Sequence, residues 1–203
     1  MKLFFAPLSP FVRKVLVTAY ETHQEHLIER VNSAPHPVNR DEAIAHYNPL
    51  GQAPTVVTDE GEALYGSRVI CEYLDARSNG LKVFPAAGSD RWEALVQQAL
   101  GDGITDAALL ARYEQTVRPA ELRWEAWRDT QLTKVTAGLD EVDRLATTFG
   151  DKVIIPMITI ACAIGYLDFR FGDLNWRSGR PHASQWYERF AARPSMMATR
   201  PEA

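Results

Sequence analysis

Cysteine is scarce in this chain of 203 residues, which contains only Cys71 and Cys162. Two cysteines so far apart exclude a disulfide framework and an all-cysteine zinc site. The five histidines show no metal-ligand spacing, and no glycine-rich loop is present that would cradle a phosphate. We therefore expect no metal, two buried core cysteines and a reducing, cytoplasmic location.

Excess positive charge and long apolar runs are also absent. Lys and Arg number 22 against 26 Asp and Glu, so the formal net charge is -4, which argues against nucleic-acid binding. The most apolar stretch, 153–167, falls short of the roughly 18–20 residues that span a bilayer, and the apolar start of the chain is too short for a signal peptide. We expect neither nucleic acid nor a membrane as a partner, and a buried core helix in 153–167.

The periodicity of the sequence changes near residue 80. Before it, short β-rich segments alternate with helical ones in the order β-α-β-α-β-β-α. The first half requires a crossover helix between parallel strands, and the second half contains an antiparallel hairpin. This predicts a four-stranded mixed sheet with helices on both faces. The strands are expected at 2–5, 25–31, 55–58 and 63–65, and the helices at 10–22, 41–47 and 67–77.

After a linker at 80–89 that is rich in Gly, Pro and Ser, every segment has helical spacing. We therefore expect an α/β domain over 1–79 and an all-α domain over 90–203. Helices are predicted from about residue 90, after Pro119, at 159–171 and at 182–192. The first of these has an apolar face that we expect to be buried, formed by Trp92, Leu95, Val96, Ala99, Leu100, Gly103, Ile104, Ala107, Ala108 and Ala111.

The run Ser9-Pro10-Phe11-Val12 lies between the first strand and the first helix. A serine before a proline at the first helical position is typically a helix N-cap. The same position lies beside free backbone N–H groups that favour an anion, so Ser9 is alternatively a donor to a thiolate. Without cysteine at positions 9 or 12, dithiol exchange cannot occur. Arg13 and Lys14 are interpreted as a solvated helix edge.

Two further junctions are candidates for a binding site. Pro54 immediately precedes a strand. If the Ala53-Pro54 bond is cis, the Ala53 backbone points outward and can hold a peptide-like ligand in an extended manner; the alternative is an ordinary trans loop proline. Ser67, after Gly66, begins a helix and is either a plain helix cap or part of a carboxylate site.

The order and spacing of these three motifs resemble the glutathione S-transferase superfamily over the whole chain. The resemblance rests on the Ser-Pro-Phe start of the first helix, the Asn-Pro-x-Gly-x-x-Pro loop at 48–54, and the serine of the third helix. It implies a thioredoxin-like amino-terminal domain with an all-helical second domain, and it is greatest to bacterial members that use serine.

The resemblance also implies roles for individual residues, with glutathione as co-substrate. Ser9 would stabilise the glutathione thiolate, Ala53 before a cis Pro54 would pair with the cysteinyl amide, and Gln52 and Ser67 would hold the carboxylate and γ-glutamyl ends. An electrophilic small molecule would lie in a cleft. The residues implied to line that cleft are Phe11, Ile104, Ala108 and Tyr113.

The chain departs from the family pattern at two places. Gly66 stands where members usually carry an acidic or amide side chain that holds the γ-glutamyl group. Thr159 is followed at the third position by Cys162 rather than Asp, so it can cap a helix but the reciprocal bond of a capping box is lost.

The resemblance implies a homodimeric glutathione transferase that conjugates an electrophile or, on the same site, reduces peroxides. A second hypothesis, favoured by Gly66, is a non-catalytic transferase-like protein with a binding or regulatory role.

Overall fold

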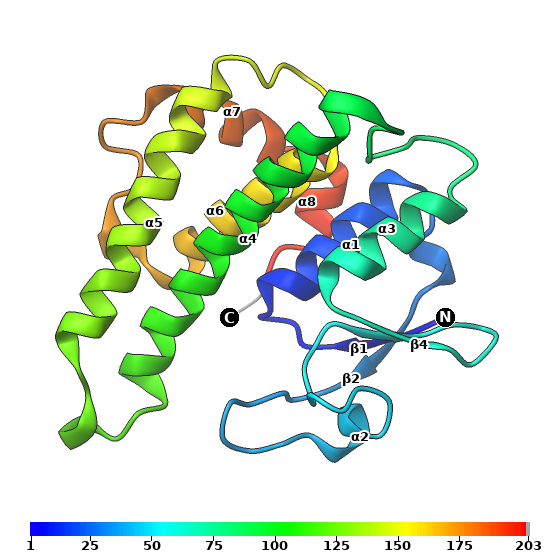
Figure 1. Cartoon of the computed structure of the whole chain (residues 1–203), viewed down its shortest axis with the longest axis horizontal. Helices are drawn as coiled ribbons and strands as arrows, with labels where there is room; N and C mark the ends of the chain where they lie inside the picture. The colour runs from blue at the N-terminus through cyan, green and yellow to red at the C-terminus, as the bar shows by residue number, and fades with distance from the viewer. Residues whose placement is uncertain (202–203) are drawn as a thin grey trace. The chain divides into compact units, whose positions relative to one another are not determined.

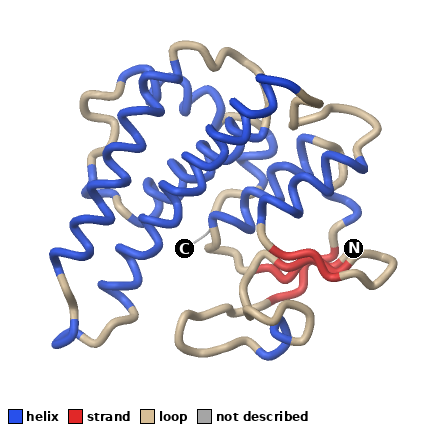
Figure 2. Tube along the Cα trace, viewed as in Figure 1, coloured by secondary structure: helices blue, strands red, loops and turns tan. Residues whose placement is uncertain are grey.

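The structure is a computed structural model that describes residues 1–201, and these form two compact units. The first unit comprises Met1–Ala86 together with the segment from Pro194 onward, and the second comprises Ala87–Arg193. All strands of the described residues belong to the first unit, and the second unit is helical (Figure 2). The sequence assigned all of 90–203 to the helical domain, so the return of the last segment to the first unit differs from that expectation.

The first unit is built on a mixed sheet with the strand order β2-β1-β3-β4. β1 is parallel to β2 and antiparallel to β3, which in turn pairs with β4 in a hairpin. The predicted sheet is therefore confirmed, although the second strand begins only at Glu29 because Glu25–Leu27 form a 3-10 turn. The strands are β1 (Lys2–Phe5), β2 (Glu29–Asn32), β3 (Thr55–Val57) and β4 (Ala63–Tyr65).

Three helices complete the body of this unit: α1 (Pro10–Glu21), α2 (Glu42–Ala45) and α3 (Ser67–Arg77). α1 and α3 pack against each other on one side of the sheet, and α2 lies on the other (Figure 1). The short α2 is anchored by Ile44, which is fully buried, and the ring of the nearby Tyr47 contacts Phe4 of β1. Helices thus cover both faces, as the sequence predicts.

α1 is buried on almost every side, which corrects the interpretation of Arg13 and Lys14 as a solvated edge. Arg13 is 9% exposed and Lys14 is 1% exposed. The guanidinium of Arg13 donates to the carbonyl of Met196 at 3.0 Å, in a short helix α8 (Pro194–Ala198) that packs on α1. Covering by α8 is the physical reason why Arg13 is buried and why the last segment belongs to the first unit.

The second unit contains four longer helices: α4 (Gly88–Thr116), α5 (Glu125–Ala146), α6 (Ile155–Arg170) and α7 (Pro181–Ala191). α4 packs against both α5 and α6. A Cβ atom on Gly101 would lie 2.9 Å from Cγ2 of Thr159, and one on Gly138 would lie 2.5 Å from Cγ1 of Ile104. Both glycines therefore permit a close approach of helices. This explains why glycine occurs at these positions, although it weakens a helix by roughly 0.5–1 kcal/mol relative to alanine.

The buried face of α4 differs from the expected one. Ile104, Ala107, Ala108 and Ala111 are buried as predicted, but Trp92 is 69% exposed and Val96 is 68% exposed. Ala99 and Gly103 are also exposed. Buried polar residues, among them Gln98 and Asp102 at 2% exposure each, take part of the inner face instead. The apolar pattern predicted the wrong buried face because apolar residues occur nearly all round this helix and do not single out one side.

α6 begins four residues earlier than the helix expected at 159–171. Pro156 lies in its first turn, where the missing N–H group leaves no unmet hydrogen bond. Thr159 is consequently inside the helix and not a cap, and its hydroxyl donates to the carbonyl of Ile155 at 2.8 Å. α6 is buried along most of its length, as the sequence predicts. Across residues 1–201, no helix combines the length and apolarity needed to cross a membrane.

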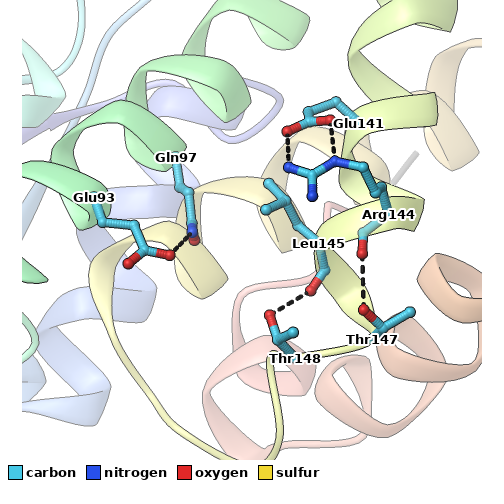
Figure 3. Close-up of polar contacts among 7 residues, drawn as sticks. All are labelled: Glu93, Gln97, Glu141, Arg144, Leu145, Thr147 and Thr148. Atoms are coloured by element: carbon cyan, nitrogen blue, oxygen red, sulfur yellow. Dashed lines mark hydrogen bonds and ion pairs between the residues drawn. The ribbon is translucent and has the colours of Figure 1, made fainter.

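The carboxyl-terminal end of α5 is closed by side chains (Figure 3). The hydroxyls of Thr147 and Thr148 donate to the carbonyls of Arg144 and Leu145, each at 2.9 Å. Arg144 forms a two-pronged ion pair with Glu141 one turn earlier. The two threonine hydroxyls thus satisfy carbonyl groups of the last turn, which have no partner within the helix.

Candidate functional site

Ser9 is the N-cap of α1. Its hydroxyl oxygen accepts a hydrogen bond from the backbone N–H of Val12 at 3.3 Å, and its backbone is extended, with φ -80° and ψ 121°. The side chain is half-buried. A hydroxyl carries one proton and two lone pairs, so the cap uses a lone pair and leaves the proton for donation. The two alternatives for Ser9, a helix cap and a donor to an anion, are therefore compatible.

The loop before β3 contains a cis Ala53-Pro54 bond, the alternative that would turn the Ala53 backbone outward. Pro54 is buried and Ala53 is half-buried. Within residues 1–201, the N–H and carbonyl of Ala53 make no hydrogen bond. A donor and an acceptor of the main chain are thus left unpaired directly before the strand, as a peptide-like ligand in extended conformation would require.

Asn48 organises this loop, a role that sequence reasoning missed. Asn48 is 1% exposed, and its amide donates at 3.0 Å to both the carbonyl of Gln52 and the hydroxyl of Thr55. Its amide oxygen accepts the backbone N–H of Leu50 at 3.0 Å, and the Thr55 hydroxyl donates to the Gln52 carbonyl at 2.7 Å. The asparagine of the Asn-Pro motif was the available signal, because a buried amide must satisfy several hydrogen bonds.

Gly66, and not Ser67, is the N-cap of α3, which corrects the expected cap. Its φ of +85° lies in a region that L side chains rarely adopt, which explains glycine at this position. Its N–H donates to the carbonyl of Pro54 at 3.3 Å. Ser67 is the first helical residue and only 7% exposed, and its hydroxyl makes no hydrogen bond within residues 1–201. Its hydroxyl and the first N–H groups of α3 lie together at the helix N-terminus, where the backbone favours an anion.

The strand register brings the three junctions to one edge of the sheet. Thr55 pairs with Phe4 near the end of β1 and with Tyr65 at the end of β4. The chain therefore leaves β1 toward Ser9, enters β3 from Pro54 and leaves β4 toward Gly66 at the same edge. Gln52 in the neighbouring loop is exposed.

The four residues that the resemblance assigns to the electrophile lie in different units. Phe11 is half-buried on α1 of the first unit. In the second unit, Ile104 and Ala108 are 2% and 0% exposed, and Ile104 packs beside Gly138 of α5. Tyr113 is half-buried, and this burial raises the pKa of its phenol. Its hydroxyl is therefore protonated and a hydrogen-bond donor at neutral pH.

The remaining reactive groups have structural surroundings. Cys71 and Cys162 are buried and form no disulfide, as the sequence predicts for core cysteines. Asp59, at the tip of the β3–β4 hairpin, has its pKa lowered by a hydrogen bond from the amino terminus at 2.7 Å. Among residues 1–201, no group of three or more His, Cys, Asp or Glu side chains is arranged to hold a metal ion.

Comparisons with known proteins identify the family of this fold. Residues 8–77 match the family model of the glutathione S-transferase N-terminal domain, and residues 125–189 match that of the C-terminal domain. The uncharacterized GST-like protein YibF of Escherichia coli strain K12 is 35% identical over 204 residues, which cover 99% of this chain and 98% of YibF.

Solved structures also match this protein over the whole chain. A glutathione transferase family member from Pseudomonas fluorescens Pf-5, solved with bound glutathione, is 43% identical with a TM-score of 0.97, covering 100% of this chain and 99% of its own. A second structure of a family member from that strain contains S-(propanoic acid)-glutathione, with 42% identity, a TM-score of 0.93 and full coverage of both chains. With a thioredoxin-like sheet unit, a helical unit and these relatives, the chain belongs to the glutathione S-transferase family.

Proposed function

We propose that this protein is a glutathione transferase in which Ser9 activates the glutathione thiol. The observation that carries the proposal is the meeting of the Ser9, Pro54 and Gly66 junctions at one sheet edge. The Pseudomonas fluorescens relative that is bound to glutathione supports the same ligand here.

Ser9 would act by stabilising the thiolate in preference to the thiol. A free thiol has a pKa of about 8.5, and each unit of lowering requires roughly 1.4 kcal/mol. One hydroxyl donor together with the N-terminus of α1 supplies about one or two units. The thiolate sulfur then donates an electron pair to an electrophilic carbon, forming an S–C bond, while the leaving group departs with the electrons of the broken bond. No covalent bond to the protein forms.

The tripeptide would be held mainly by main-chain groups of the first unit. The unpaired N–H and carbonyl of Ala53 would pair with the cysteinyl portion of glutathione. Ser67 and the first N–H groups of α3 would hold one carboxylate, and the exposed Gln52 would contact an end of the molecule. Gly66 provides no side chain for the γ-glutamyl group, and a charged hydrogen bond of that kind contributes roughly 1.5–3 kcal/mol.

Conjugation is the reaction that we favour over peroxide reduction. The Pseudomonas fluorescens family member bound to S-(propanoic acid)-glutathione holds a glutathione derivative substituted on sulfur. For the electrophile we propose contacts with Phe11 and Tyr113, which are half-buried. Ile104 and Ala108 are 2% and 0% exposed, so they would support the residues that contact the electrophile.

A homodimer in the cytoplasm is part of the proposal. Trp92 and Val96 are four residues apart on one face of α4 and each is more than two-thirds exposed, as expected of an interface. Val96→Glu should lower the molar mass measured by light scattering to that of one chain. A mass unchanged by this substitution would remove α4 from the interface. Two buried cysteines that form no disulfide are compatible with a reducing compartment.

The proposal is tested by calorimetric titration with glutathione and by following thiolate absorbance of the bound tripeptide against pH. Ser9→Ala should raise the pKa of the bound thiol by about one or two units and leave affinity nearly unchanged. Ser89→Ala, at the start of α4, is the matched control and should change neither quantity. An unchanged thiol titration in Ser9→Ala would remove Ser9 from the mechanism.

A non-catalytic transferase-like protein remains the second candidate, and the absence of a side chain at Gly66 favours it. The same titration separates the two. Saturable binding at millimolar concentrations or below supports the enzyme, and no binding at about 10 mM glutathione supports the regulatory candidate.

A further inference from the structure

Two arginines of the second unit lie near each other without a counter-ion. Arg112 is on α4 and Arg170 is at the end of α6, and both are half-buried. Within residues 1–201 neither guanidinium forms an ion pair or a side-chain hydrogen bond. Arg170 contacts only an aromatic face, with its guanidinium carbon 4.0 Å from the ring centre of Phe169, and its Nε is buried without a partner.

The packing of α4 on α6 brings these residues together. The two helices cross closely where Gly101 meets Thr159 and Ile160, and they run in the same direction (Figure 1). Arg112 follows Gly101 by the same number of residues as Arg170 follows Thr159, about 16 Å along each helix. The two arginines therefore reach the same level of the helix pair.

Tyr166 joins the cluster from α6, one turn before Arg170. It is 5% exposed, and its hydroxyl makes no hydrogen bond within residues 1–201. Burial raises the pKa of Tyr166 to about 12, with opposing effects from the charges of Arg112 and Arg170, so that the phenol is a neutral donor. The ring of Tyr166 is buried, whereas its hydroxyl is not among the enclosed polar atoms, so the hydroxyl can donate to a ligand.

The pKa of Arg170 shows the effect of a nearby positive charge without a counter-ion. Desolvation, followed by the positive charge of Arg112, lowers the pKa of Arg170. A guanidinium nevertheless stays protonated at neutral pH, so the protein holds two cations together at a partly buried place. An anion bound there would relieve their repulsion and accept the hydrogen bonds that the protein leaves unmade.

We propose that Arg112 and Arg170 bind the carboxylate of a small aromatic acid, with the hydroxyl of Tyr166 as a further donor. A planar guanidinium matches a carboxylate in two-pronged geometry. The surroundings suit an aromatic body, because Phe169 stacks on Arg170 and the ring of Phe171 meets Tyr166 edge-on at 6.3 Å. Tyr113, which the proposed function assigns to the electrophile, follows Arg112 directly in α4 and is near enough to Tyr166 to act on it electrostatically. The inference therefore rests on the proposed function and names the substrate class of the electrophile.

The test is a calorimetric titration of the full chain with benzoate and with benzamide, its neutral counterpart. We expect benzoate to bind at millimolar concentrations or below and benzamide to bind at least tenfold more weakly. Equal binding of both, or no binding of benzoate at about 10 mM, would overturn the proposal. Inorganic phosphate that binds more tightly than benzoate would overturn the assignment of a carboxylate.

Variants locate the site. Arg112→Gln should weaken benzoate at least tenfold, and Arg112→Lys should restore only part of the affinity because an ammonium cannot form the two-pronged pair. Arg123→Gln, an exposed arginine between α4 and α5, is the control and should leave binding unchanged. Benzoate affinity retained in Arg112→Gln would refute the site. Glutathione is titrated separately, so a failure of this inference and a failure of the proposed function give different results.

Discussion

The close approach of α4 and α6 at Gly101 predicts that Gly103→Ala stabilises the protein and that Gly101→Ala does not. Both residues lie inside α4, two positions apart, and alanine improves helix propensity by roughly 0.8–1 kcal/mol at either one. A Cβ atom at Gly103 meets nothing within 4 Å. Gly103→Ala should therefore increase the free energy of unfolding by about 0.5–1 kcal/mol.

At Gly101 the same methyl group collides with buried atoms. It would lie 2.9 Å from Cγ2 of Thr159 and 3.1 Å from the backbone nitrogen of Ile160, and both residues are at most 2% exposed. Overpacking of this kind costs about 1–3 kcal/mol. The gain in propensity offsets part of the cost, so Gly101→Ala should be neutral to about 2 kcal/mol destabilising, and the two alanine variants should differ by about 1–3 kcal/mol.

The assay is urea unfolding of both variants at one protein concentration, together with the double variant Gly101→Ala/Thr159→Ser. Serine lacks the Cγ2 methyl but keeps a hydroxyl that can donate to the Ile155 carbonyl, so it should recover part of the lost stability. If Gly101→Ala is as stable as Gly103→Ala, or if Thr159→Ser recovers nothing, the close contact does not set the cost.

Three further changes have definite expected outcomes. Gly66→Glu should destabilise the protein by about 1–3 kcal/mol, because φ is +85° there, yet tighten glutathione binding in calorimetry; unchanged affinity would mean that another side chain already holds the γ-glutamyl group. Asp75→Ala should lower the free energy of unfolding by about 1–3 kcal/mol in urea titration, since the buried carboxylate accepts two backbone N–H groups of the loop after α3; a smaller loss would show that water replaces it. The pKa of Glu114 is lowered by the N–H of Trp124 and by Arg118, so its contribution is present above the unfolded pKa of about 4.3 and is lost as pH falls through the lower folded value. Glu114→Gln should accordingly reduce the drop in Tm between about pH 5 and pH 3, and an identical drop would exclude this carboxyl as the cause.

The sheet and the three junctions were predictable because short-range rules determine them. Strand periodicity, a crossover helix and a hairpin leave few topologies, and Ser9 and Pro54 mark where the chain turns. The cis bond before Pro54 was one of two open alternatives, because sequence does not decide the isomer. The N-cap of α3 is Gly66 and not the expected Ser67. The chain enters the helix through the positive φ of Gly66, and no side-chain oxygen caps the first turn.

Burial was less predictable wherever a second element decides it. Arg13 and Lys14 have the polarity of surface residues but are buried, and Arg13 is covered by α8, which comes from the far end of the sequence. Trp92 and Val96 are apolar but exposed, and nothing in their helix alone distinguishes them from the buried Ala107. The cluster of Arg112 and Arg170 could not be predicted because the two residues are distant in sequence and belong to no motif.

The contact of α8 with α1 has a consequence for biosynthesis. Arg13 is translated near the beginning of the chain, but the carbonyl of Met196 that accepts its hydrogen bond is translated near the end. The hydroxyl of Ser195 likewise pairs with Glu21 at the end of α1. On the ribosome, the sheet and α1 can therefore assemble early but lack their last covering helix until the whole helical unit has been synthesised. The second unit is an insertion within the first, and the first unit is completed last.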